Sequence, residues 1–166
     1  MSLSVEEFNV ASAEAVGEIL ATCAPIASWR AGILARRPYS SLEQLLETAA
    51  ALAEGWTDQE VDAALAHHPR IGEKAAGESV EARASRAEQG SLSEDERAQQ
   101  EWLAANKEYE ERFDRIFLIR ARGRSHQEML AQLRGRLEND ADAEARIRRE
   151  QLAEIALLRL ADAVTS

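Results

Sequence analysis

The chain has 166 residues, 45% of them hydrophobic and 30% charged, with only 3 Pro and 8 Gly. This composition fits one ordinary folded domain with its own core, covering residues 1–166, and excludes a disordered or collagen-like chain. Thirty acidic residues against twenty basic ones give a formal net charge of −10, which disfavours partners such as nucleic acid or an anionic membrane surface.

Signals for a membrane or an oxidising compartment are missing from the sequence. No apolar run reaches the roughly 18 residues that a membrane span needs, and the N-terminal MSLSVEEFNV is acidic and lacks the apolar part of a secretion signal. The single cysteine, Cys23, permits no intrachain disulfide and no thiolate-rich metal site. We therefore expect a cytoplasmic enzyme or binding domain.

Aliphatic residues recur every three or four positions in nearly every segment, which predicts an all-α fold. Helices are expected at 12–23, 25–36, 41–53, 57–66, 73–89, 94–113, 126–137 and 141–163. Capping boxes, in which a Ser or Thr and a residue three positions later satisfy each other's backbone amides, mark helix starts. They occur at Ser4/Glu7, Ser41/Gln44, Thr57/Glu60, Ser93/Glu96 and Ser125/Glu128.

Three local signals modify this helical pattern. Pro25 suits the first turn of the helix 25–36, and Pro38 is expected to end it, because a proline disfavours helical geometry in the residue before it. The third signal is the apolar run Ile116–Ile119, which lies between charged residues and is followed by Gly123. This run is either a buried extended segment or the end of the helix 94–113.

The most unusual polar cluster is the segment His67-His68-Pro69-Arg70-Ile71-Gly72, at the end of the helix 57–66. Pro69 moves His68 out of helical geometry, so that the loop can present an imidazole to a cavity. Histidine is the usual acid or base near neutral pH. The alternative is that the two histidines only end a helix, where a cation interacts favourably with the helix dipole.

Two further polar features suggest ligand contacts. On a helix, Ser85, Glu88 and Gln89 share one face and could hold a planar ligand with amide groups, although the same residues also suit a capping box or a solvated face. Arg159 lies in the apolar stretch Ala156–Ala161, where its guanidinium either binds a carboxylate at two points, pairs with an internal acid or turns to solvent. Motifs typical of metal sites, phosphate loops and nucleophile elbows do not occur in the sequence.

Six short groups of residues, taken together, are similar to one family over nearly the whole chain. They are Trp29 with Arg37-Pro38-Tyr39, His68-Pro69-Arg70-Ile71-Gly72, Ser85-x-x-Glu88-Gln89, Asn106-x-x-Tyr109 with Phe113, the strip Phe117–Ala121, and Leu158-Arg159-Leu160-Ala161-Asp162. In this order and spacing they resemble the 2-oxo-4-hydroxy-4-carboxy-5-ureidoimidazoline (OHCU) decarboxylases of the ureide pathway. The resemblance implies a compact all-α homodimer that needs no cofactor and no metal and converts OHCU into (S)-allantoin and CO2.

The resemblance also implies roles for individual residues. His68 takes the catalytic position, with Glu88 beside it as a second catalytic group. Substrate-binding positions fall on Pro69, Ser85, Gln89, Phe117, Leu118, Ile119, Arg120, Ala121 and Arg159. His67 and His126 match no functional position, and the ending Val-Thr-Ser carries no peroxisomal signal, which favours a bacterial-type cytoplasmic enzyme.

The chain departs from the family pattern at two places. Where the family usually reads Phe-Gly-Phe-Pro-Phe, this sequence has Phe113-Asp114-Arg115-Ile116-Phe117, so that a glycine and a proline that shape the turn are replaced. Arg120 stands where a small or apolar residue is usual, and it either points outward or adds positive charge near the pocket. The rival functions are a non-catalytic helical protein that binds a partner, and a paralogue that acts on a related ureido or hydantoin acid.

Overall fold

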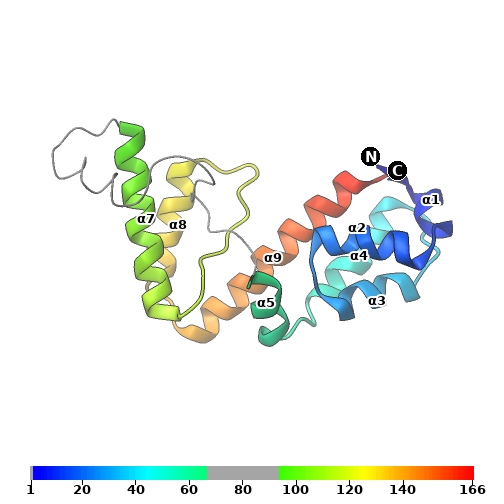
Figure 1. Cartoon of the computed structure of the whole chain (residues 1–166), viewed down its shortest axis with the longest axis horizontal. Helices are drawn as coiled ribbons and strands as arrows, with labels where there is room; N and C mark the ends of the chain where they lie inside the picture. The colour runs from blue at the N-terminus through cyan, green and yellow to red at the C-terminus, as the bar shows by residue number, and fades with distance from the viewer. Residues whose placement is uncertain (1, 67–93) are drawn as a thin grey trace. The chain divides into compact units, whose positions relative to one another are not determined.

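The structure, a computed structural model, describes residues 2–66 and 94–166 (Figure 1). Within these ranges the chain forms eight helices and two strands of two residues each, and the predicted all-α fold is confirmed. The helices are α1 (Val5–Val10), α2 (Ala13–Cys23), α3 (Ala27–Ala35), α4 (Leu42–Ala53), α5 (Asp58–Leu65), α7 (Glu94–Phe113), α8 (His126–Arg136) and α9 (Ala141–Ala163). The strands are β1 (Leu3–Ser4) and β2 (Val164–Thr165).

Most helices begin and end where the sequence predicts. The bounds of α2, α4, α5, α7, α8 and α9 agree with the expected ranges to within one residue. The short helix α1 and the two strands were not predicted, although the capping box at Ser4 marks the start of α1. The helix expected at 73–89 and the capping box Ser93/Glu96 involve residues outside the described ranges.

Complete capping boxes start three of the described helices, as the sequence indicates. The complete capping boxes at Ser4/Glu7, Thr57/Glu60 and Ser125/Glu128 are confirmed. At α4 only half of the predicted box forms. The Ser41 hydroxyl accepts from the Gln44 backbone N–H at 3.1 Å, but the Gln44 side chain accepts from the backbone N–H of Ser40 at 2.7 Å, one residue earlier than expected.

Helix α3 starts two residues later than predicted. Ile26 is its N-cap, has an extended backbone and makes no side-chain capping bond. The Ile26 backbone N–H donates to the Ala24 carbonyl at 2.9 Å, which makes a tight turn centred on Pro25. This turn buries the Ile26 side chain and delays the helix. At its other end α3 stops at Ala35, before Pro38, as expected.

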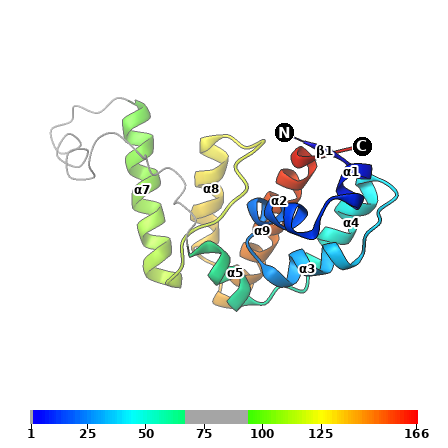
Figure 2. The ribbon, with the colours of Figure 1, turned by 45° about the vertical axis from the view of Figure 1, so that its right-hand side comes forward.

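The chain divides into two compact units. The first unit comprises Met1–His67 and Ala145–Ser166, and the second comprises His68–Glu144. In the first unit α3 packs against both α2 and α4, and the parallel pair β1–β2 joins the two ends of the chain, with Leu3 opposite Val164 (Figure 2). In the second unit α7 packs against α8.

Each unit has its own buried centre. In the first, the Trp29 indole N–H donates to the Ala49 carbonyl at 2.9 Å. The rings of Trp29 and Trp56 pack edge to face, with their centres 5.8 Å apart. In the second, apolar side chains of α7 and α8 enclose part of the segment that joins these two helices. The buried cluster consists of Trp102, Ala105, Tyr109, Phe117, Ile119, Met129 and Leu133.

Candidate functional site

The segment Phe117–Ala121, which we call the strip, joins α7 to α8 in the second unit. Helix α7 ends at Phe113, and the strip is not helical, so the extended alternative for the run Ile116–Ile119 is confirmed. Phe117, Leu118 and Ile119 are at most 2% exposed. Arg120 is half-buried and Ala121 is exposed. The strip therefore has a buried first half and an accessible second half.

A left-handed residue turns the chain from α7 into the strip. Asp114 has a φ of 56°, and its backbone N–H donates to the Glu110 carbonyl at 2.8 Å, which closes the end of the helix. Glycine adopts this conformation at little cost, and aspartate is among the few other residues that tolerate it. The left-handed turn that suits the family's glycine is thus made here by Asp114.

Aromatic rings hold the first residue of the strip. The Phe117 ring packs edge to face against the rings of Trp102 and Tyr109, with ring centres 6.0 and 5.2 Å apart. The Arg136 guanidinium lies 4.4 Å from the centre of the Phe117 ring. Phe117 therefore contacts two rings of α7 and a cation of α8, which favours one position for this side chain.

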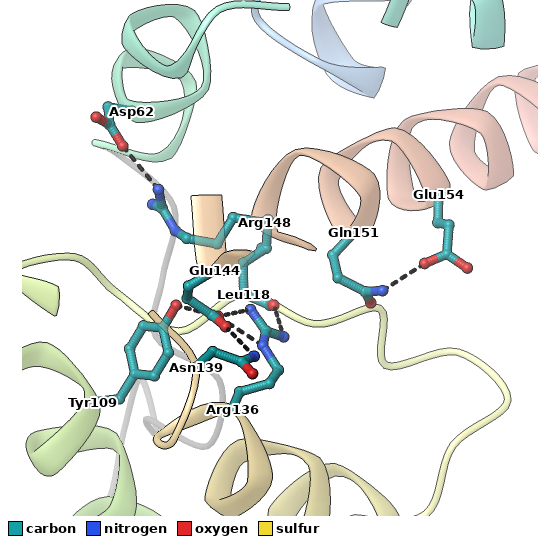
Figure 3. Close-up of polar contacts among 9 residues, drawn as sticks. All are labelled: Asp62, Tyr109, Leu118, Arg136, Asn139, Glu144, Arg148, Gln151 and Glu154. Atoms are coloured by element: carbon teal, nitrogen blue, oxygen red, sulfur yellow. Dashed lines mark hydrogen bonds and ion pairs between the residues drawn. The ribbon is translucent and has the colours of Figure 1, made fainter. Parts of the chain in front are cut away.

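Figure 3 shows a buried polar network beside the strip, centred on Arg136 and Glu144. Arg136 donates two hydrogen bonds to Glu144 Oε1, one from Nε at 2.7 Å and one from Nη2. Its Nη1 donates to the Leu118 carbonyl at 2.8 Å. The Tyr109 hydroxyl donates to Glu144 Oε1 at 2.5 Å, and the Asn139 amide donates to Glu144 Oε2 at 3.2 Å. Together these bonds link α7, α8, the start of α9 and the backbone of the strip.

The charges of this network are almost fully shielded from water. Arg136 is 6% exposed and Glu144 is 1% exposed. Two buried charges are tolerated only when they are paired and hydrogen-bonded, and here the guanidinium reaches both the carboxylate and a carbonyl. The family resemblance includes Tyr109 but neither Arg136 nor Glu144. In the sequence, Arg136 fits an ordinary cation near a helix C-terminus, and Glu144 fits an ordinary acid near a helix N-terminus.

Arg120 is held within the turn that follows the strip. Its Nη1 donates to the Arg122 carbonyl, and Arg124 Nη1 in turn donates to the Arg120 carbonyl at 3.3 Å. Gly123 completes the turn with a φ of 82°. The Arg120 guanidinium thus bonds a carbonyl of its own turn, at a position where the family usually has a small or apolar residue.

Arg159 lies on α9 in the first unit, and its side chain is exposed. Its Nη1 donates to the Thr22 carbonyl at 3.3 Å, near the C-terminal end of α2, where a cation interacts favourably with the helix dipole. The neighbouring thiol of Cys23 is buried, and burial raises its pKa above the ordinary value, while Arg159 acts in the opposite direction. Arg159 therefore bonds the last turn of α2 while its side chain remains exposed to solvent.

The remaining predicted site residues, His68, Pro69, Ser85, Glu88 and Gln89, lie outside the described residues. The first unit has a pocket of about 530 Å³ between α4 and α9, and it contains none of the predicted residues. Its lining consists of Ala50, Ala53, Glu54, Arg149, Glu150, Ala153 and Glu154. Among the described residues, no group of His, Cys, Asp and Glu side chains could hold a metal ion. No helix in this part of the chain is long and apolar enough to cross a membrane.

Comparisons with known proteins point to one family. The family model described as OHCU decarboxylase matches residues 9–161. A crystal structure of OHCU decarboxylase in the presence of (S)-allantoin is 26% identical and has a TM-score of 0.67, covering 88% of this chain and 96% of that one. A crystal structure of (S)-allantoin synthase shares the fold, with a TM-score of 0.70 at 17% identity, covering 98% of this chain and 54% of that one. No curated protein matches the chain.

Proposed function

We propose an active site for this chain, which belongs to the OHCU decarboxylase family because the family model matches residues 9–161. The protein is a carboxy-lyase of urate degradation that decarboxylates OHCU to (S)-allantoin and CO2. In our proposal the whole chain, residues 1–166, is one family domain that works as a cytoplasmic homodimer. The family match supports the domain, and sedimentation of the purified protein tests the dimer.

The substrate's own structure shapes what the protein has to do. When the bond between C4 and the carboxylate breaks, its electron pair forms a C4=C5 bond and the electrons of the C5=N bond move to nitrogen, which takes a proton. CO2 leaves, and the product of this step is an enol at C4. The enol hydroxyl then loses its proton while C5 gains one from a single face, which gives the S configuration. The protein must therefore orient the carboxylate and control protons on one side of the ring.

We assign these tasks to the residues that match the family. His68 is the general acid or base, and Glu88 hydrogen-bonds the C4 hydroxyl and helps its proton to leave. Ser85 and Gln89 hold amide groups of the ring and the ureido tail, and Pro69 contacts the substrate beside them. The match between their spacing and the family motif supports these roles.

The described residues complete the proposed site. The strip, including Arg120 and Ala121, lines the substrate pocket, and Arg159 binds an anionic oxygen of the substrate. The exposure of Arg159 and the accessible second half of the strip support these roles, because both leave polar groups within reach of a ligand.

His68→Ala tests the catalytic assignment. We expect this variant to lose stereospecific turnover, with a rate reduced on the order of 10²–10⁴-fold, because a positioned acid or base contributes that much. The substrate is made fresh from urate with urate oxidase and hydroxyisourate hydrolase, and circular dichroism follows the formation of optically active allantoin. His67→Ala and His126→Ala are matched controls that should keep near-wild-type rates. A near-wild-type rate for His68→Ala would refute the assignment.

Arg159→Ala tests the anion-binding assignment separately. Loss of a charged hydrogen bond costs about 1.5–3 kcal/mol, which corresponds to a KM roughly 10- to 150-fold higher with a smaller change in kcat. Arg149→Ala, on the same helix, is the control and should leave KM near the wild-type value. A wild-type KM for Arg159→Ala would mean that the substrate anion binds elsewhere.

A further inference from the structure

The strip takes a hydrogen bond from a side chain of the neighbouring helix α8. The Leu118 carbonyl accepts from Arg136 Nη1 at 2.8 Å, and Leu118 is 1% exposed. A buried carbonyl without a partner is costly, so this bond favours the observed orientation of the peptide unit between Leu118 and Ile119. The same guanidinium covers the Phe117 ring from 4.4 Å. Arg136 thus contacts both the backbone and a side chain of the strip.

Arg136 is itself fixed from its other side. Its Nε and Nη2 both donate to Glu144 Oε1, and the Tyr109 hydroxyl donates to the same oxygen (Figure 3). A planar guanidinium bonded along one edge to a carboxylate has a defined plane, and its remaining nitrogen then points in a defined direction. In this structure that direction leads to the Leu118 carbonyl.

We propose that Arg136, oriented by Glu144, is a positioning residue for substrate binding: it holds the strip in the conformation in which its accessible half lines the substrate pocket. This inference rests on the proposed function, in which the strip belongs to that pocket. Arg136 and Glu144 are themselves buried and act through the strip. Because the strip is assigned to substrate binding and not to proton transfer, its displacement should raise KM more than it lowers kcat.

Arg136→Lys is the main test. Lysine keeps the positive charge, but its single ammonium group cannot keep the fixed planar geometry in which one edge bonds Glu144 and the remaining nitrogen bonds Leu118. We expect KM to rise at least tenfold and kcat to fall less than threefold, with substrate generated and product detected as for His68→Ala. Enzyme concentration is corrected for the folded fraction, measured by far-ultraviolet circular dichroism at the assay temperature.

Two matched controls separate positioning from general stability. Tyr109→Phe keeps the ring against Phe117 and removes a hydrogen bond to Glu144 without touching Leu118, so its KM should stay within twofold of wild type even if the protein is less stable. Arg134→Lys alters an exposed arginine of α8, whose Nη2 lies 3.6 Å from Glu101 Oε2, and this variant should behave as wild type.

Glu144→Gln provides a second variant in case Arg136→Lys does not fold. It keeps the size of the side chain and one oxygen acceptor but weakens the hold on the guanidinium, and we expect KM to rise at least threefold. An unchanged KM in the folded variants would overturn the proposal, as would a rise equal to that of Tyr109→Phe or a failure of both Arg136→Lys and Glu144→Gln to fold. Failure of the catalytic assignment would appear separately, as activity in His68→Ala.

Discussion

Replacing Asp114 with glycine should stabilise the turn that leads from α7 into the strip. Asp114 is exposed and has a φ of 56°, in the left-handed region. Its carboxylate also lies at the C-terminal end of α7, where the helix dipole is negative. Glycine removes both unfavourable features while leaving the backbone bond from the Asp114 N–H to the Glu110 carbonyl in place.

The size of the effect is the sum of three contributions. Relief of the left-handed conformation is worth about 1 kcal/mol, at the low end of the range because aspartate tolerates it better than most residues. Removal of the carboxylate from the helix end adds about 0.3–1 kcal/mol. The greater freedom of glycine in the unfolded chain subtracts about 0.4–1 kcal/mol. The net stabilisation is about 0.3–1.6 kcal/mol, which raises Tm by about 1–6 °C in a chain of this length.

Thermal and urea unfolding of Asp114→Gly, followed by far-ultraviolet circular dichroism, measure this gain. Asp114→Asn is the matched control, because asparagine removes the charge and still tolerates the left-handed region. It should show only the part of the gain that comes from the charge, about 0.3–1 kcal/mol. A Tm for Asp114→Gly below that of wild type would refute the reasoning, because it would mean that the position does not favour glycine.

Three further predictions concern the first unit. The pKa of the Glu60 carboxyl lies below its ordinary value of 4.5, mainly because the Ser28 hydroxyl donates a hydrogen bond to it. The ionised carboxylate therefore stabilises the fold fully above pH 4.5, and this stabilisation is lost as the pH falls through the lowered pKa. The difference in unfolding free energy between wild type and Glu60→Gln should therefore shrink on acidification from about pH 6 to 3, and a constant difference would contradict this. Because burial raises the pKa of the Cys23 thiol, a disulfide reagent at about pH 8 should label it at least tenfold more slowly in the native protein than in urea, and equal rates would show that the thiol is accessible. Arg37 Nη1 donates to the carbonyls of Phe8 and Ala11, at 3.0 and 2.7 Å, so Arg37→Met should lower the urea unfolding free energy by about 1.5–3 kcal/mol, and a change below about 0.5 kcal/mol would mean that these bonds contribute little.

The helices could be predicted because the signals that make them are local. A capping box such as Thr57/Glu60 uses residues three positions apart, so both of its bonds lie within one turn of the helix. The errors arise where a local signal is weak or has two meanings. The start of α3 is one case, since Pro25 suits either a first helical turn or the tight turn observed before it.

The family and its reaction could likewise be inferred from the order and spacing of short motifs in the sequence. The arrangement around the strip could not, because it depends on contacts between distant parts of the chain. Arg136 is bonded to Leu118, eighteen residues away, and to Glu144, eight residues away, and Tyr109 reaches Glu144 over thirty-five residues. In sequence each of these charges looks like an ordinary residue near a helix end. Only when α7, α8 and the start of α9 pack together does burial require that they pair, and that pairing determines where the strip lies.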